Sequence, residues 1–163
     1  MRAEVRQCAT DQDYAALTRF YLQHCREFDG QYMLQDGLAH LISTISDSRF
    51  LLFHDQKGEM IAFIQYRCEK DQKSVCIDSA ILVKEFRSSR VFYEGLRDLA
   101  KCIRNDYPET DSLYFFAIAD DKYINRLYRK FAEIVDVGER NGRKEHVYAV
   151  NMDQLFQYLK LGF

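Results

Sequence analysis

Residues 74–104 read SVCIDSAILVKEFRSSRVFYEGLRDLAKCIR, and they contain the change of pattern on which the fold depends. The first part, 74–83, is rich in apolar and β-branched side chains, which is typical of a strand. From about Ser89 the apolar residues fall three or four positions apart, which predicts a helix to about Arg104. The segment between strand and helix is short and basic. Such a segment is a common place for a protein to bind phosphate, because the amides at a helix start attract anions.

A further strand is expected after this helix. Asp106-Tyr107-Pro108 should end the helix, since the residue before a proline disfavours helical geometry, and DSLYFFAIA at 111–119 has the composition of a buried strand. The strand-helix-strand unit over 74–119 is long enough for a right-handed crossover between parallel strands. It predicts an α/β fold.

The rest of the chain supplies more strands and helices. Asn141-Gly142 suits the tight turn of a hairpin, and Asp120 or Asp121 is a candidate cap for a helix that follows. We therefore predict one domain over residues 1–163, with a mixed central sheet flanked by helices. The further expected elements are strands at 2–8, 49–54, 60–68 and on both sides of residues 140–143, and helices after Thr10-Asp11, after Asp36, after Asp121 and near 152–161.

Composition narrows the class of protein. Hydrophobic residues make up 47% and charged residues 29% of the chain, the balance of a soluble globular protein. The formal charge is −2, so we expect no nucleic-acid partner and no membrane association. The five cysteines form no C-x-x-C pair, which favours reduced thiols in the cytoplasm and no metal site. The four histidines also lack metal-ligand spacing and are interpreted as ordinary (His24, His40, His54, His146).

The order of elements and the basic segment after the fourth strand resemble the GNAT-type N-acetyltransferases. That family carries V-x-P-x-x-R-x-x-G-x-G/A at this place, and the matching stretch here is LVKEFRSSRVF, residues 82–92. Arg87 stands at the family's leading Arg/Gln position, while Arg90 and Phe92 stand at its two glycine positions. The resemblance covers nearly the whole chain in element order but few motif positions.

The resemblance implies acetyl-coenzyme A as co-substrate. Free amides and a helix dipole bind anions whatever the side chains, so the segment is a candidate cradle for the coenzyme pyrophosphate despite its missing glycines. The strand end would pair with the pantetheine arm. The alternative is that Arg87 and Arg90 are only solvated charges at a helix start. The implied coenzyme-binding residues are Ile81, Leu82, Val83, Arg87, Ser88, Ser89, Arg90, Val91 and Phe92.

A second motif of the family concerns the catalytic acid. The pattern N-x-x-A-x-x-L-Y-x-x-x-G-F is matched at Leu127 and Tyr128, with Asp121 in place of its asparagine. The resemblance implies that Tyr128 protonates the departing thiolate. The alternative is a tyrosine that only packs against its neighbours, since the chain has 11 tyrosines.

The general base implied by the resemblance is a carboxylate on the fourth strand. Asp78 is the one carboxylate there, and a carboxylate in an apolar strand is costly unless it has a partner or a function. The alternative is that Asp78 only pairs with a neighbouring arginine or backbone amide at the end of the sheet. The resemblance also implies an acceptor pocket near Glu27, Asp29 and Tyr32.

Three functions remain open at this point. The first is transfer of an acyl group from acyl-coenzyme A to the amine of a small molecule or protein, without a covalent enzyme intermediate. The second is a GNAT-like interaction module that has lost catalysis, and the third is a transferase that uses another acyl donor. A homodimer is also left open by the resemblance.

Overall fold

The computed structural model describes residues 2–28, 34–140 and 142–162. Its contacts divide the chain into two compact units. The first comprises residues up to 67 and 79–94, and the second comprises 68–78 and residues from 95 onward. Strand β4 (Ser74–Leu82) and helix α3 (Ser89–Asp106) contribute residues to both units. The single domain expected over 1–163 stays a prediction.

The described residues form a mixed sheet of seven strands in the order β1-β2-β3-β4-β5-β7-β6. The pairs β1–β2, β2–β3, β5–β7 and β6–β7 are antiparallel, and β4–β5 is parallel. The α/β fold class with helices flanking a mixed sheet is thereby confirmed. The other strands are β1 (Glu4–Gln7), β2 (Arg49–His54), β3 (Met60–Cys68), β5 (Ser112–Ile118), β6 (Glu133–Arg140) and β7 (Arg143–Asn151).

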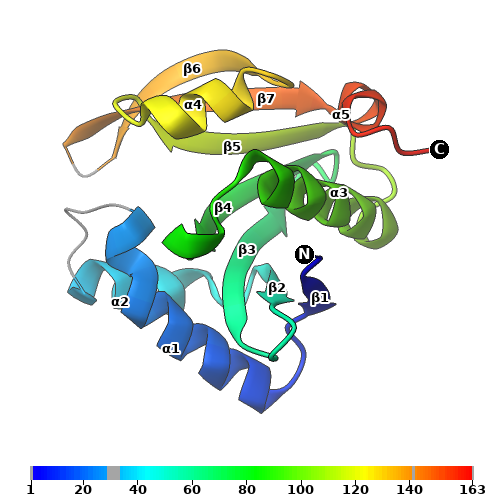
Figure 1. The fold of residues 1–163 in the computed structure, drawn as a ribbon. Coiled ribbons are helices and arrows are strands. Elements are labelled where there is room, and N and C mark those ends of the chain that lie inside the picture. Colours follow the sequence, from blue (N-terminus) through cyan, green and yellow to red (C-terminus); the bar gives the residue numbers. More distant parts are fainter. Residues whose placement is uncertain (1, 29–33, 141, 163) are drawn as a thin grey trace. The chain divides into compact units, whose positions relative to one another are not determined.

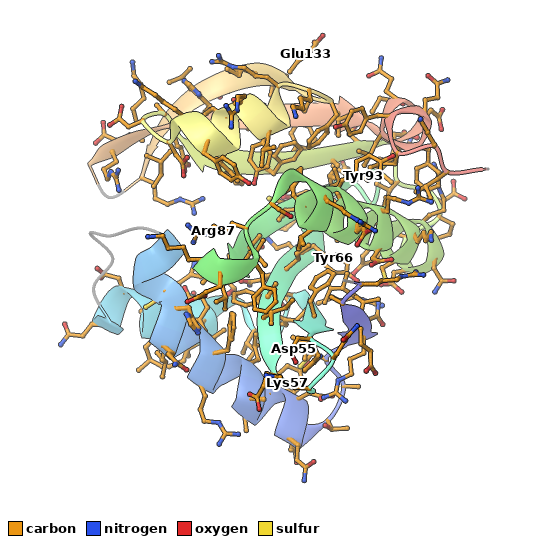
Figure 2. The ribbon with its side chains drawn as sticks, in the orientation of Figure 1. Asp55, Lys57, Tyr66, Arg87, Tyr93 and Glu133 are labelled. Carbon is orange, nitrogen blue, oxygen red and sulfur yellow. The ribbon has the colours of Figure 1, made fainter. Side chains whose placement is uncertain are left out.

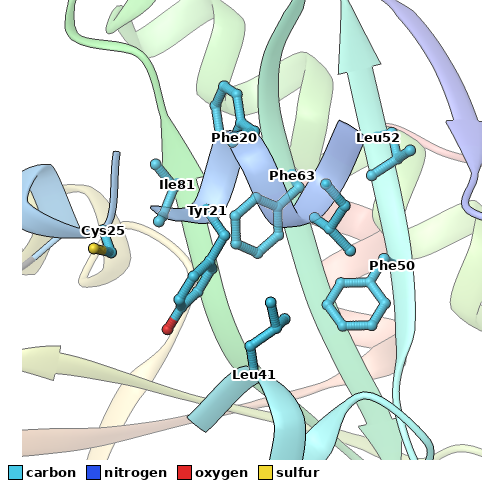
Figure 3. Packing of buried hydrophobic residues seen from close by; sticks show 9 residues of the cluster. Phe20, Tyr21, Cys25, Leu41, Phe50, Leu52, Phe63 and Ile81 are labelled. Carbon is cyan, nitrogen blue, oxygen red and sulfur yellow. The ribbon is translucent and has the colours of Figure 1, made fainter. Parts of the chain in front are cut away.

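In the first unit, helices α1 (Asp11–Phe28) and α2 (Leu34–Thr44) pack against the strands (Figure 1). The phenyl ring of Phe63 lies at the centre of this core, with edge or tilted contacts to Phe20, Tyr21 and Phe50 at centroid distances of 5.8–6.3 Å. Such aromatic pairs stabilise a core beyond the area that they bury. Figure 3 shows the cluster, which consists of Leu17, Phe20, Tyr21, Cys25, Leu41, Phe50, Leu52, Phe63 and Ile81.

Helix α2 differs in part from the sequence expectation. Leu38, Leu41, Ile42 and Ile45 follow Asp36 at helical spacing; of these four, Leu41 is buried and Ile45 packs against the core. Leu38 and Ile42 are 41% and 66% exposed. The helix therefore buries a narrower face than its apolar spacing indicates.

The first turn of α1 is held by a reciprocal cap. The hydroxyl of Thr10 accepts a hydrogen bond from the amide of Asp13 at 3.1 Å, and the Asp13 carboxylate accepts from the amides of Thr10 and Ala9, each at 3.1 Å. This is the capping-box arrangement, with aspartate in the place of the usual glutamate. Arg6 on β1 adds an ion pair to Asp13 at 2.8 Å. These hydrogen bonds and the cation lower the pKa of the Asp13 carboxyl, with the Ala9 and Thr10 amides as the largest cause.

In the second unit, β5 pairs with β7 along its whole length from Ser112 to Ile118. Helix α4 (Lys122–Tyr128) follows β5, and the Asp121 carboxylate, one of the two candidates from the sequence, caps it by accepting from the Ile124 amide at 3.0 Å. The hairpin of β6 and β7 turns at Gly142, whose φ of +75° suits glycine. Helix α5 (Met152–Tyr158) ends the described chain and buries three of its apolar side chains.

In the described part of the chain, every helix is too short or too polar to cross a bilayer.

The Thr10–Asp13 cap predicts an acid-dependent stability of the first unit. Asp13→Asn should lower the free energy of unfolding by about 1 kcal/mol at neutral pH, because it weakens the cap and removes the ion pair. Since folding lowers the pKa of Asp13, its contribution is present above the pKa of the unfolded chain, about 3.9. The contribution is lost as pH falls through the folded pKa, so the two proteins should converge in acid.

Urea denaturation of both proteins between neutral pH and pH 3 measures this difference. Asp11→Asn is the matched control, because Asp11 lies exposed in the same helical turn. A gap between wild type and Asp13→Asn that stays constant down to pH 3 would contradict the role of the Asp13 charge.

Candidate functional site

The end of β4 passes into α3 through a short 3₁₀ turn that the sequence did not predict. The Val83 amide donates to the carbonyl of Ile61 on β3 at 2.9 Å, which holds the strand end in place. The turn spans Lys84–Phe86, and its hydrogen bond from the Phe86 amide to the Val83 carbonyl is 2.9 Å long. Ile81 is buried in the core of the first unit, whereas Leu82 and Val83 are half-buried.

Ser88 caps the start of α3. Its hydroxyl oxygen accepts from the Val91 amide at 3.2 Å, and its carbonyl accepts from the Phe92 amide at 3.0 Å. A serine at this position is a preferred N-cap, since its side chain replaces a missing helical partner. Two of the amides in the predicted cradle are therefore bonded within the helix start.

The amides that precede Val91 differ from those of Val91 and Phe92 in their hydrogen bonding. No intramolecular hydrogen bond is found for the amides of Ser88 and Arg90 within the described residues. The first amides of a helix have no partner in the helix itself. The side chain of Phe92, at the second glycine position of the family motif, is half-buried.

The two arginines of this segment point to different partners. The Arg87 Nε donates to the carbonyl of Leu82 at 3.0 Å, so the side chain folds back on the end of β4 (Figure 2). The Arg90 Nε lies 3.1 Å from a carboxylate oxygen of Glu94, one helical turn further along α3. Arg90 is highly exposed, and an exposed pair of this kind stabilises little. Arg87 is thus tied to the strand end, and Arg90 to the helix surface.

Asp78 lies in the second unit, on the same face of β4 as Cys76. The Cys76 thiol donates to the Asp78 carboxylate with an S–O distance of 3.6 Å. Cys76 is buried and Asp78 is half-buried. The parallel ladder between β4 and β5 covers three residue pairs, from Ser74 opposite Ser112 to Cys76 opposite Tyr114. Asp78 follows two residues after the last of these pairs.

Tyr128 lies at the end of α4, inside a group of aromatic rings in the second unit. Its ring meets Phe115 edge-on at a centroid distance of 4.5 Å, Tyr148 at 5.3 Å and Phe131 at 6.2 Å. Burial, followed by the charge of Asp121 and the neighbouring Tyr148, raises the pKa of the Tyr128 phenol well above its ordinary value. The phenol is therefore held in its protonated form.

The residues expected near the acceptor are not all described. Asp29 and Tyr32 lie outside the described residues, and Glu27 is described only as part of the backbone of α1. Their role stays a prediction. Across the described ranges, no group of three or more His, Cys, Asp or Glu side chains could hold a metal ion.

Sequence reasoning missed a polar group beside Tyr128. The Asn125 side chain on α4 is 5% exposed, and it contacts His146 Nδ1 at 2.8 Å and the Tyr148 hydroxyl on β7. No local pattern links these residues, because they lie more than twenty positions apart. The one available signal is an asparagine three residues before Tyr128, on the buried side of the helix.

Comparisons with known proteins rest on structure alone. No family model and no curated protein matches the sequence. A solved acetyltransferase assigned to the GNAT family, from Desulfovibrio desulfuricans, matches with a TM-score of 0.70 at 14% identity, over 92% of this chain and 99% of that chain. An acetyltransferase from Salmonella typhimurium that modifies the N-terminal serine of ribosomal protein L7/L12 matches with a TM-score of 0.70 at 16% identity, over 93% and 95%.

A third match has a different substrate. The spermidine/spermine N-acetyltransferase from Vibrio cholerae matches with a TM-score of 0.66 at 9% identity, over 96% of both chains. The similarity therefore extends over whole chains rather than over one motif. The protein has the fold of the GNAT-type N-acetyltransferases.

Proposed function

We propose that the protein transfers an acetyl group from acetyl-coenzyme A to an amine, with both substrates bound together. The observation that carries this proposal is the capped start of α3 directly after β4, with Arg87 tied to the Leu82 carbonyl at 3.0 Å. An 18-residue helix supplies a strong positive end at that point. A cation and a helix start at one place suit a doubly charged pyrophosphate.

The proposed pyrophosphate cradle uses fewer backbone amides than the family motif does. We assign to it the amides of Ser88, Ser89 and Arg90, together with the charge of Arg87. Val91 and Phe92 complete the first turn, with their amides bonded to Ser88. The missing glycines reduce how closely the backbone approaches a phosphate, so we expect weaker binding than a glycine-rich loop supports.

The pantetheine arm is assigned to the edge of β4 at Ile81, Leu82 and Val83. The short ladder of three residue pairs between β4 and β5 supports this assignment. An extended arm bonds to a strand edge as an additional strand does.

Two side chains of the second unit carry the proposed chemistry. Asp78 draws a proton from the amine, directly or through water, and Tyr128 donates a proton to the departing sulfur. The raised pKa of Tyr128 supports the second role, because a phenol must be protonated to act as the donor. The amine attacks the thioester carbon, the C–S bond breaks, and no covalent intermediate forms on the enzyme.

The acceptor is an amine on a small molecule or a protein. We assign its pocket to Glu27, Asp29 and Tyr32, where two carboxylates suit a positively charged amine. Two structures with this fold come from enzymes named for spermidine/spermine and for the N-terminal serine of a ribosomal protein. Both acceptors are amines, which supports the class of substrate.

One observation favours a second function, a GNAT-like interaction module without catalysis. Arginine and phenylalanine occupy the two glycine positions, and the amide of Phe92 is bonded to the Ser88 carbonyl. A transferase that uses another acyl donor is the third candidate. A basic loop that lacks the family's glycines suits a donor other than acyl-coenzyme A. Binding of acetyl-coenzyme A separates the first function from the other two.

Acetyl-coenzyme A should stabilise the protein. At 100 times its dissociation constant, a ligand that binds only the folded state stabilises by about 2.7 kcal/mol. For a chain of this size the gain corresponds to a rise in Tm of roughly 5–10 °C. Arg87→Ala should reduce the shift at equal ligand concentration, because it removes a cation from the proposed cradle. Differential scanning fluorimetry with acetyl-coenzyme A and with coenzyme A measures both effects.

Arg19→Ala is the matched control, since Arg19 is an exposed arginine on α1 in the same unit. It should respond to the coenzyme as wild type does. An unmoved Tm at saturating coenzyme would leave the interaction module as the better function. A shift that Arg87→Ala does not reduce would place the cradle elsewhere.

Tyr128→Phe should lower kcat about 100-fold, as the loss of a general acid does, with KM for acetyl-coenzyme A unchanged. The ring contacts are kept, so the variant should fold normally. Because the pKa of Tyr128 is raised, the wild-type rate should not fall through ionisation of this phenol as pH approaches 10. Steady-state kinetics across pH, with absorbance titration of the tyrosines, test these points.

Tyr123→Phe serves as the control, because Tyr123 is 37% exposed on the same helix. It should keep wild-type turnover and should leave the last-ionising tyrosine in the titration unchanged. A Tyr128→Phe variant with full kcat would show that the phenol only packs.

A further inference from the structure

The side-chain amide of Asn125 makes four contacts inside the second unit. Its Nδ2 donates to the carbonyls of Ile118 at 2.9 Å and Asp121 at 2.7 Å. Its Oδ1 contacts the hydroxyl of Tyr148 and lies 2.8 Å from Nδ1 of His146. An amide group offers two donors and one oxygen with two lone pairs, so every position is used.

These contacts determine where the protons lie. The two carbonyl oxygens accept only, so they fix the Nδ2 group of Asn125 on their side. The Oδ1 therefore accepts from both remaining partners, which means that Tyr148 donates its hydroxyl hydrogen and His146 carries a proton on Nδ1. In a neutral imidazole with a proton on Nδ1, the Nε2 atom has a free lone pair. Asn125 thus sets His146 as a proton acceptor at Nε2.

His146 and Tyr148 lie on one face of β7, because they are two residues apart. Their rings are 6.3 Å apart, and the Tyr148 ring lies 5.3 Å from that of Tyr128. Tyr148 is fully buried, whereas His146 is half-buried. The group therefore extends from the proposed acid, Tyr128, to a partly exposed imidazole.

We propose that His146 accepts a proton at Nε2 from the acceptor amine, and that Asn125 is the positioning residue that makes this possible. The inference rests on the proposed N-acetyltransferase function. Imidazole is the side chain most often used as a general base. His146 would then take the base role that was assigned to Asp78.

In the proposed reaction the amine arrives as an ammonium ion. One N–H proton goes to His146 Nε2, and the freed lone pair forms a C–N bond to the thioester carbon. The tetrahedral adduct then breaks its C–S bond, and Tyr128 gives its proton to the thiolate. The nitrogen returns its second proton to the Tyr128 oxygen, which leaves an amide, a thiol and a protonated imidazole that loses its proton to water.

His146→Asn separates the hydrogen bond between the imidazole and Asn125 from the proposed role of the imidazole as a base. The Nδ2–H of an asparagine sits near the position of Nδ1–H, so it can keep the hydrogen bond to Asn125 while no base remains at the Nε2 position. We expect a wild-type Tm, an unchanged KM for acetyl-coenzyme A and a kcat lowered about 100-fold. Thiol release from acetyl-coenzyme A, with spermidine and with a short peptide bearing an N-terminal serine, provides the assay.

Tyr148→Phe is the matched control, because it removes the other donor to Asn125 and keeps the ring beside Tyr128. It should retain more turnover than His146→Asn. A kcat of His146→Asn within about twofold of wild type would fall far short of the loss expected for a general base. That result overturns this inference but leaves the transferase function standing. Loss of activity in Asp78→Asn would then assign the base to Asp78. A wild-type protein that releases no thiol with either amine overturns both this inference and the transferase function.

A second measurement is independent of turnover. Long-range proton–nitrogen NMR of histidine-labelled protein distinguishes a proton on Nδ1 from one on Nε2. At a pH where His146 is neutral, the wild-type protein should show the proton on Nδ1, and Tyr148→Phe should show the same form. A proton on Nε2 in the wild-type protein overturns the inference.

Discussion

The hydrogen bonds of Ser88 are the constraint on which the proposed coenzyme site depends. Its hydroxyl and its carbonyl take up the amides of Val91 and Phe92, and so they determine the residue at which α3 begins. A helix that began one turn later would carry its positive end away from the strand, and one that began earlier would consume the remaining amides. The Arg87 bond to the Leu82 carbonyl then brings a cation back to the same place. The position of the helix start and the positive charge beside it both follow from short-range contacts within eleven residues of chain.

The fold was largely predictable because periodicity reports which side of an element is buried. The strand at 74–83 and the helix from Ser89 appear close to their expected bounds, as β4 and α3. Asp121 appears as the cap of α4, since capping depends on residues three positions apart. Helix α2 shows the limit of this reasoning. Its apolar spacing does not reveal that Ile42 is 66% exposed, because exposure depends on what the rest of the chain places against the helix.

The candidate site was less predictable, because its contacts join residues far apart in sequence. Tyr128 could be identified through a motif, but its aromatic neighbours Phe115 and Tyr148 come from two other strands. His146 has no motif around it and was interpreted as ordinary. Its contact with Asn125 on α4 spans 21 positions, so no local pattern in the sequence indicates it. The Arg87 fold-back was also hidden, since a side chain to backbone contact leaves no pattern in the sequence.

The four-way bonding of Asn125 leaves this position intolerant of an aspartate, although the two side chains differ only by one nitrogen and one oxygen. At this position the new oxygen would face the carbonyl lone pairs of Ile118 and Asp121 without a hydrogen between them. Burial of the side chain leaves no water to relieve that repulsion. A side chain of nearly the same shape is therefore excluded at residue 125 by hydrogen-bond polarity alone, and the start of α4 depends on the two amide hydrogens.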